Sequence, residues 1–249
     1  MRFALETSDG RPRLAAEAGS VAKAFANRII CVGRNYSDHA KEMGNEDSPW
    51  PEIFLRMPST LIGPADGIRL PAISEAVDYE GELAVVIEKA GRNVPASQGY
   101  EHVFGYTIVN DVSVRDWQRR GQQWTTGKNF DGTLPVGPTV VTKDELDPSD
   151  LRLQTRLNGE TVQDARTSQL IFDAPTLVEF ISTWTTLQPG DLICTGTPGG
   201  VGAARTPPLW LKHGDTVQIE IEGIGTLENR VTKDDAQPVT DRWRKVVES

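Results

Sequence analysis

Three carboxylates in two strand-like stretches are the first residues whose types and spacing could do chemistry. Glu80 and Glu82 stand two positions apart, so on a strand their side chains point to the same face. Asp111 ends an apolar stretch, 105–111, and could complete a site that another strand begins. Three carboxylates without histidine or cysteine favour Mg²⁺, Mn²⁺ or Ca²⁺ over zinc, and they leave coordination positions for a bidentate 2-oxo acid. For the glutamate pair alone, the alternative is a solvated strand face.

A histidine and a glutamate three residues apart form the second group. In the stretch 33–43, which has a helical pattern, His39 and Glu42 share one face. A carboxylate beside an imidazole fixes its tautomer and makes it a better base, so His39 is the best candidate for a general base. The other two histidines, His102 and His213, lie in polar, turn-like stretches without such a partner. The alternative for the pair is an ordinary surface ion pair.

A lysine and a glycine-rich turn could bind the anionic part of a substrate. Lys128 follows a glycine in a stretch similar to a phosphate-binding loop, but five residues rather than four separate Gly121 from Gly127. Asn129 also stands where such a loop needs Ser or Thr. We therefore interpret Lys128 as a cation aimed at an anionic ligand, with a surface lysine as the alternative. The turn within 189–202 exposes backbone N–H groups that could bind a carboxylate, or it is only a tight turn.

The elements that must position these residues are mostly strands. Alternating apolar positions predict strands at 83–87, 151–157 and 217–221, and a continuous apolar run predicts another at 28–33. Asn158-Gly159 predicts a hairpin turn. The sequence therefore indicates a strand-rich α+β protein with few helices.

One clear amphipathic helix and three less regular segments complete the organisation. The helix begins near Pro175, and its expected apolar face consists of Leu177, Phe180, Ile181 and Trp184. Residues 1–26 are expected to form a short N-terminal segment, 44–51 a mobile loop, and 233–249 a loosely held tail.

The composition excludes several classes of function. The chain has 249 residues, a formal net charge of −9, 38% hydrophobic and 24% charged residues, which is typical of a globular protein and unfavourable for nucleic-acid binding. Two cysteines, Cys31 and Cys194, lie in apolar runs and are expected to be free, buried thiols. No apolar stretch has the length of a membrane span, and the N-terminus lacks the pattern of a signal peptide. We expect a cytoplasmic protein without a membrane or nucleic-acid partner.

Five motifs in register resemble those of the fumarylacetoacetate hydrolase family, in particular a bacterial member similar to acylpyruvate hydrolases. The resemblance extends from about residue 29 to 231. The motifs are VGRNYSDHAKEM (32–43), DYEGELAVVI (78–87), GYTIVNDVSVRDWQ (105–118), TGKNFDGTLPVGP (126–138) and PGDLICTGTPGGVG (189–202). Each motif is weak alone, but together they are specific for the family.

The resemblance implies a fold, a cofactor and a site. It implies a catalytic domain over 27–232 with the mixed β-roll, or distorted barrel, of the family's C-terminal domain, usually as a homodimer. It implies Mg²⁺ or Mn²⁺ bound by Glu80, Glu82 and Asp111, and a catalytic group of His39, Glu42 and Lys128. The substrate-binding positions that it implies are Arg34, Tyr36, Arg115, Gln118 and Thr197.

The resulting hypothesis is cleavage of the C–C bond of an acylpyruvate, a 2,4-dioxo acid such as fumarylpyruvate, to pyruvate and a carboxylic acid. His39, held by Glu42, would activate water, and Lys128 or Gln118 would stabilise the oxyanion. The alternatives are decarboxylation of oxaloacetate, isomerisation or hydration of an unsaturated 2-oxo acid, and a non-catalytic protein that binds 2-oxo acids. One departure bears on the substrate, because Arg56 stands where the family often has lysine.

Overall fold

A nine-stranded mixed sheet forms the centre of the computed structural model, which describes residues 1–8, 11–236 and 243. Its strand order is β2-β1-β11-β9-β8-β14-β3-β4, and β5 pairs with β11. The bounds are β1 (Arg2–Ser8), β2 (Arg11–Leu14), β3 (Ile29–Gly33), β4 (Glu52–Arg56), β5 (Leu61–Ile62), β8 (Gly81–Ile87), β9 (Val103–Asn110), β11 (Leu134–Thr142) and β14 (Leu192–Cys194). Most pairs are antiparallel, whereas β14–β3 and β11–β5 are parallel.

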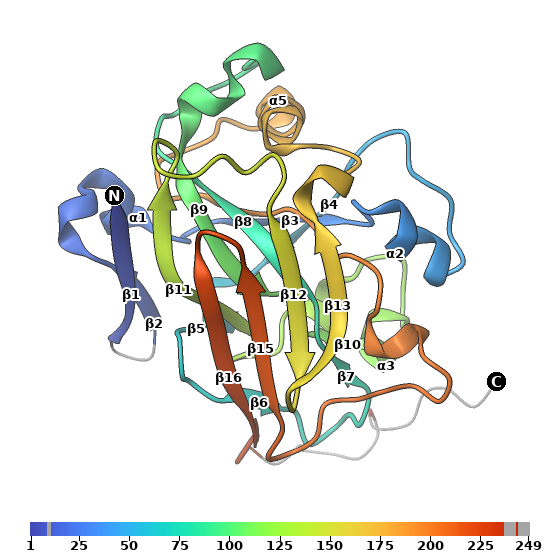
Figure 1. Cartoon of the computed structure of the whole chain (residues 1–249). Coiled ribbons are helices and arrows are strands. Elements are labelled where there is room, and N and C mark those ends of the chain that lie inside the picture. Colours follow the sequence, from blue (N-terminus) through green and yellow to red (C-terminus); the bar gives the residue numbers. More distant parts are fainter. Residues whose placement is uncertain (9–10, 237–242, 244–249) are drawn as a thin grey trace.

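A five-stranded sheet packs against the first one, at the front of Figure 1. Its order is β13-β12-β15-β16-β6, with bounds β6 (Ile68–Leu70), β12 (Arg152–Leu157), β13 (Glu160–Arg166), β15 (Thr216–Ile221) and β16 (Gly225–Lys233). A small pair, β7 (Val77–Asp78) and β10 (Ser113–Val114), lies next to the ends of β8 and β9. The strand-rich α+β prediction is confirmed.

The contact between the two sheets explains the glycine between the two glutamates. A Cβ atom at Gly81 would lie 2.3 Å from the Thr155 hydroxyl and 3.1 Å from Ile219, both of which belong to the second sheet. Only glycine allows this close approach. Every residue of β8 is buried, as expected for a central strand that is covered on both faces.

The predicted hairpin turn is confirmed between β12 and β13. Asn158 and Gly159 have φ angles of 52° and 85°, which both central residues of a type I′ turn require. At the N-terminus, β1 and β2 pair antiparallel, with Leu5 opposite Leu14.

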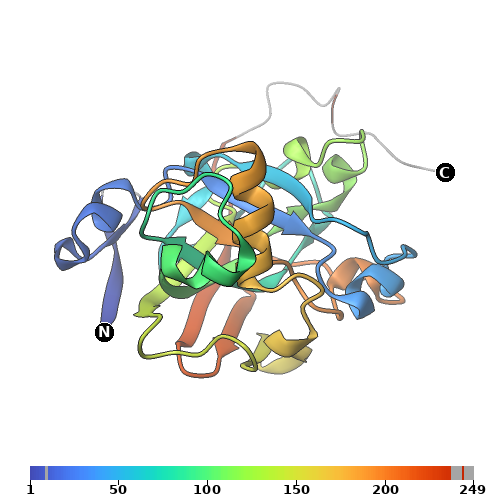
Figure 2. The ribbon, with the colours of Figure 1, turned by 90° about the horizontal axis from the view of Figure 1, so that it is seen from above.

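The α-helices among the described residues are short except for one. They are α1 (Ser20–Ala24), α2 (Ser37–Glu42), α3 (Arg115–Gln118), α4 (Thr125–Lys128) and α5 (Ala174–Trp184). Asp173 caps α5, because its carboxylate accepts the Thr176 N–H at 3.0 Å. Helix α5 lies across the top of the molecule beside the 3-10 helix η3 (Ala96–His102), as Figure 2 shows.

The predicted apolar face of α5 was partly wrong. Leu177 and Ile181 are buried and Phe180 is partly buried, but Trp184, the last residue of the helix, is 48% exposed. A helical periodicity gives the direction of a side chain but not where the partner surface ends.

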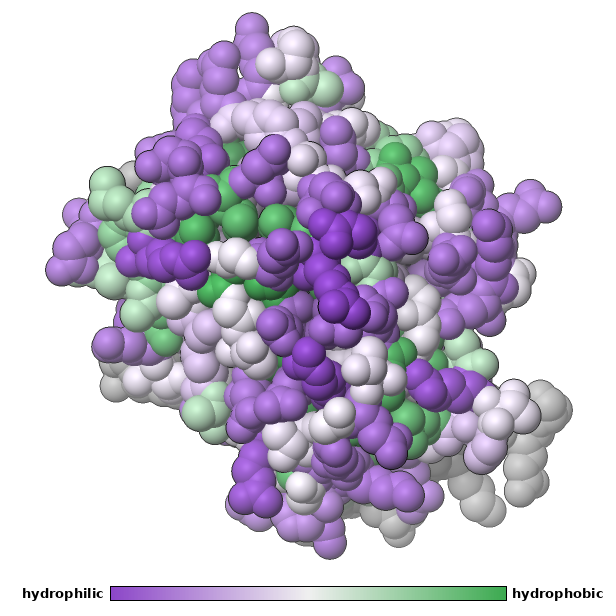
Figure 3. Space-filling view, viewed as in Figure 1, coloured by the Kyte–Doolittle hydropathy of each residue, from purple (hydrophilic) through white to green (hydrophobic). Residues whose placement is uncertain are grey.

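The surface and the cysteines match the sequence-based expectations in outline. The face in Figure 3 is mostly hydrophilic, with hydrophobic residues in separate patches. Cys31 and Cys194 are free and buried, as predicted. Within the described residues, no helix is long and apolar enough to cross a membrane. The predicted tail, 233–249, falls largely outside the described residues.

Candidate active site

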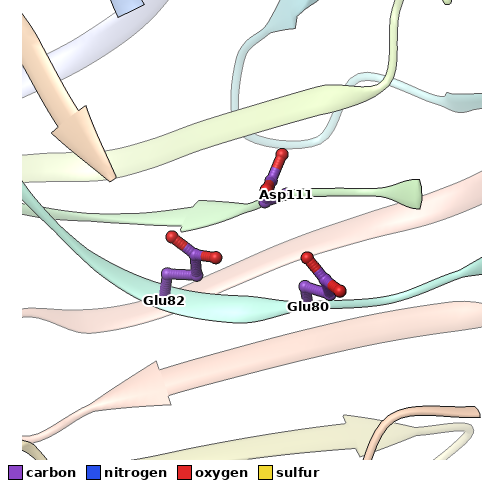
Figure 4. A group of neighbouring side chains, drawn as sticks. All are labelled: Glu80, Glu82 and Asp111. Carbon is purple, nitrogen blue, oxygen red and sulfur yellow. The ribbon is translucent and has the colours of Figure 1, made fainter. Parts of the chain in front are cut away.

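The three carboxylates of the sequence analysis meet at one end of the central sheet. Glu80 directly precedes β8, Glu82 lies within it, and Asp111 directly follows β9. Because Gly81 pairs with Asn110, the strand ends are level, and the Asp111 N–H donates to the Glu80 carbonyl oxygen at 2.8 Å. All three side chains are buried, and one oxygen atom of each lies within 4.8 Å of the others. Figure 4 shows Glu80 and Glu82 on one strand, with their carboxylates on the side of the neighbouring strand end that carries Asp111.

Buried cations surround two of the carboxylates. Lys128 Nζ lies 2.5 Å from Glu80 Oε2 and 2.6 Å from Asp111 Oδ2. Arg115 donates to Glu80 Oε1 at 2.6 Å, and Arg56 donates to Asp111 Oδ1. Burial alone would raise the pKa of Glu80, but the charges of Lys128 and Arg115 outweigh it and lower that pKa to about 2. Glu80 is therefore fully ionised at neutral pH.

In the part of the chain that the structure describes, Glu82 has no hydrogen bond or ion pair with a basic side chain. Its Oε2 accepts only the Gly196 N–H, at 2.9 Å, among the described residues. Burial, together with the negative charge of Asp111, raises the pKa of Glu82 well above its ordinary range. A cation bound beside Glu82 would remove this penalty, since it would replace the missing positive charge.

The donor set fits a hard divalent cation. The ammonium group of Lys128 lies between Glu80 and Asp111, so this position already stabilises a positive charge. Only oxygen atoms are offered, which suits Mg²⁺ or Mn²⁺ rather than zinc or copper. Arg56 holds Asp111 Oδ1 and Lys128 holds Asp111 Oδ2, so an ion bound by Asp111 would share Oδ2 with the ammonium group or displace it.

The histidine–glutamate pair lies on α2, as predicted, and His39 lines the cavity that contains the carboxylates. His39 Nδ1 is 2.8 Å from Glu42 Oε1, and Glu42 Oε2 accepts the Gly200 N–H at 2.8 Å. Glu42 is thus fixed by the backbone, and its contact with Nδ1 leaves Nε2 of His39 as the nitrogen that can exchange protons. The pair is largely buried rather than a surface ion pair.

A cavity of about 320 Å³ connects these groups. It brings together the three carboxylates, His39 and Lys128. The proposed substrate-binding residues in its lining are Arg34, Arg115, Gln118 and Thr197. Glu42 stands behind His39 and does not line the cavity.

Tyr36 is the one predicted substrate-binding residue that the structure does not bring into this cavity. It is 2% exposed and borders a different pocket, together with Pro198 and Gly199. Its hydroxyl has no hydrogen-bond partner among the described residues. A role for Tyr36 in substrate binding remains a prediction.

Several acidic and amide side chains that the sequence analysis did not single out orient the lining. Asp78 accepts from Arg115 Nε at 2.8 Å and from the N–H groups of Gly202 and Ala203, so it joins the cavity to the glycine-rich turn. Gln163 donates to the Thr197 hydroxyl at 2.8 Å. Asp78 lies in the same motif as Glu80, which is the one signal that could have indicated it.

The cation–acid pairing of Arg34 was also unexpected. Arg34 pairs with Glu52, and its guanidinium lies 5.7 Å from the centre of the Trp124 ring. Glu52 belongs to β4, which pairs with β3 at Gly33. The sequence alone does not reveal this neighbour, because the strand register brings the two residues together.

Comparison with known proteins gives one family for most of the chain. Residues 28–232 match the family described as fumarylacetoacetate (FAA) hydrolase, C-terminal. The chain is 47% identical over 208 residues to a Bos taurus protein named oxaloacetate tautomerase FAHD2A, mitochondrial. This alignment covers 82% of the chain but only 66% of the bovine protein, so the chain spans just under two thirds of that relative's length.

Solved structures with the same fold cover nearly the whole chain. A fumarylacetoacetate hydrolase from Exiguobacterium antarcticum has a TM-score of 0.84 and 35% identity, with 94% of this chain and 100% of that one aligned. A 2-hydroxyhepta-2,4-diene-1,7-dioate isomerase from Mycobacterium marinum has a TM-score of 0.78 and 38% identity, with 95% of this chain and 100% of that one aligned. The expected mixed β-roll is thereby confirmed.

Proposed function

This chain belongs to the fumarylacetoacetate hydrolase family, a family of enzymes, and on that premise we propose that it moves a proton at the carbon next to the keto group of a small 2-oxo acid. The first candidate reaction is interconversion of the keto and enol forms of oxaloacetate. The observation that carries the proposal is that His39 lines the same cavity as Glu80, Glu82 and Asp111. A base and an anchoring point for a 2-oxo acid thus stand side by side.

The protein side chains have separate tasks in this proposal. Nε2 of His39 takes the proton from the carbon, while Glu42 holds the ring and balances its positive charge. The proton then returns to the enolate oxygen or to the carbon, so tautomerisation consumes no water and releases none. Arg115 Nη1 holds Oε1 of Gln118 at 3.0 Å, which leaves the Gln118 amide N–H groups as donors toward the substrate oxygens.

The carboxylates would hold Mg²⁺ or Mn²⁺. When bound, this ion supplies Lewis-acid polarisation of the keto group, which acidifies the neighbouring C–H bond. Lys128 and Arg115 keep Glu80 ionised and in place. Burial of these groups limits the access of water, so their attraction to Glu80 is weakly screened.

A second candidate is hydrolysis of an acylpyruvate, which the sequence analysis placed first. The observation in its favour is the fixed His39–Glu42 pair, because an imidazole backed by a carboxylate can also deprotonate water. Two of the relatives are named a tautomerase and an isomerase, which favours proton transfer on a 2-oxo acid, whereas the Exiguobacterium antarcticum protein is named a hydrolase. Decarboxylation of oxaloacetate is the third alternative.

One panel of reactions separates these candidates. The purified protein is given oxaloacetate and an acylpyruvate with Mg²⁺ or Mn²⁺, and then with EDTA. We expect metal-dependent acceleration of the enol–keto conversion of oxaloacetate, followed by its ultraviolet absorbance. Metal-dependent pyruvate formation from the acylpyruvate would favour hydrolysis, and pyruvate with CO₂ from oxaloacetate would favour decarboxylation. No acceleration of any of these reactions would contradict the proposal.

A further inference from the structure

A guanidinium that the mechanism above does not use lines the cavity. Arg119 follows α3 directly, and its backbone N–H donates to the Arg115 carbonyl oxygen at 3.1 Å. Side chains four residues apart project from the same side of a helix, with Cβ atoms about 5–6 Å apart. Arg115 is buried against Glu80, whereas Arg119 is exposed and borders the cavity. The Arg115 side chain therefore lies next to the carboxylates, and the Arg119 side chain lies nearer to solvent.

Arg119 differs from the other arginines and the lysine of the lining in its pairing. Each of those cations has an acidic partner: the pairs are Arg34–Glu52, Arg115–Asp78 and Lys128–Asp111. Within the described part of the chain, the Arg119 side chain makes no ion pair or hydrogen bond. Its charge is thus available to a ligand, while the charges of the others are already balanced.

The rest of the lining offers little that could select for a second negative charge. Met43, Phe54 and Trp124 are apolar, and Asn45 is neutral. A planar guanidinium can bind a carboxylate with two parallel hydrogen bonds, which gives both direction and strength.

We infer that Arg119 binds the distal carboxylate of a dicarboxylic 2-oxo acid and so selects diacids over monoacids of the same length. The inference rests on the proposed function, since the 2-oxo end of the ligand lies at Glu80, Glu82 and Asp111. Arg115 and Arg119 are separated by a single helical turn, so they suit a ligand with a short carbon chain and a carboxylate at each end.

The test compares pairs of ligands that differ only in a terminal carboxylate or methyl group. Oxaloacetate is paired with 2-oxobutanoate, and 2-oxoglutarate with 2-oxopentanoate, and each is titrated calorimetrically into the full-length, Mg²⁺-saturated protein. We expect the wild type to bind the diacid about tenfold more tightly in at least one pair, as one charge-assisted contact provides. Arg119→Gln should remove that preference by weakening diacid binding, with monoacid binding unchanged.

Arg120→Gln is the matched control. Arg120 has the same charge and neighbours Arg119, but it lies 3.6 Å from the Trp117 ring centre and does not line the cavity. It should keep the wild-type preference. If Arg119→Gln keeps the preference as well, or if the wild type has none, the inference is overturned while the proposed function stands. If the wild type binds none of the four acids, both are overturned.

Discussion

The stability of the site depends on the positive charge of one buried residue, Lys128. Its ammonium is buried between Glu80 and Asp111, and their charges outweigh the effect of burial and raise its pKa. In the absence of metal, Lys128→Met would leave two buried carboxylates without this counter-charge. We expect a loss of about 3–5 kcal/mol in the free energy of unfolding, measured by denaturation in EDTA.

Lys143→Met is the control for that substitution. Lys143 forms a partly exposed pair with Glu88 at 3.7 Å, so we expect a loss of at most about 1 kcal/mol. Equal losses in the two variants would mean that the Lys128 network contributes no more than a surface pair.

A substitution at Arg56 tests whether metal binding needs the planar geometry of its guanidinium or only its positive charge. Its guanidinium joins Asp111 to the Thr133 hydroxyl and carbonyl oxygen, which one ammonium cannot reproduce. Arg56→Lys should therefore keep the fold but weaken Mg²⁺ binding about tenfold, since Asp111 loses its fixed orientation and hydrogen bonds that orient a metal ligand change metal affinity on this scale. Calorimetric titration of Mg²⁺ measures the effect, and an unchanged affinity would contradict it.

At the residue scale, the sequence indicated the candidate metal ligands and the candidate base because their types and spacing are local. The partners of these residues were not predictable in the same way. Arg56 meets Asp111 across 55 positions although three strands separate β4 from β9 in the sheet order, and Arg34 meets Glu52 across 18 through the register of β3 and β4. A single sequence does not give that register.

At the scale of elements, the turn after β14 holds both Glu82 and α2. The Gly196 N–H donates to Glu82, and the Gly200 N–H donates to Glu42. Gly196 has a φ of 101°, and a Cβ there would lie 2.8 Å from Cβ of Asn35. Gly196→Ala should shift the turn and weaken Mg²⁺ binding, measured by calorimetry, by more than tenfold.

The Gly214→Ala variant separates the effect of backbone strain from the effect of a steric clash at the new Cβ atom. Gly214 has a similar φ of 94°, with nothing within 4 Å of a Cβ. The Gly214→Ala variant should have a lower stability but an unchanged Mg²⁺ affinity. A Gly196→Ala variant with unchanged Mg²⁺ affinity would show that the turn does not position Glu82.

The elements themselves were mostly predictable, and their limits were less so. Period-two alternation and Asn158-Gly159 gave the hairpin of β12 and β13 correctly. Trp184 was assigned to the buried face of α5 but is exposed. Its environment depends on how far the underlying sheet extends, which is a property of the assembled fold.

At the scale of the whole molecule, metal binding should stabilise the fold, because the carboxylates join two strands of the central sheet. At a concentration 100 times the dissociation constant, the ion adds about 2.7 kcal/mol, which corresponds to a Tm increase of about 5–10 °C. Glu82→Gln should abolish most of this increase and change the metal-free Tm little, because glutamine resembles the protonated form that the raised pKa of Glu82 favours. Thermal denaturation with and without Mg²⁺ measures both.

Glu160→Gln, an exposed substitution on β13, serves as the control and should respond to Mg²⁺ like the wild type. A full Mg²⁺ response in Glu82→Gln would mean that the ion binds elsewhere.

The most direct measurement is deuterium exchange at the carbon beside the keto group of oxaloacetate in D₂O, followed by NMR with Mg²⁺. The wild type should accelerate this exchange. His39→Gln should slow it by about 100-fold or more, the usual contribution of a general base, with an unchanged Mg²⁺-induced increase in Tm. Exchange at the wild-type rate in His39→Gln would contradict the role of His39 as the base, and no metal-dependent exchange in the wild type would contradict the proposed function itself.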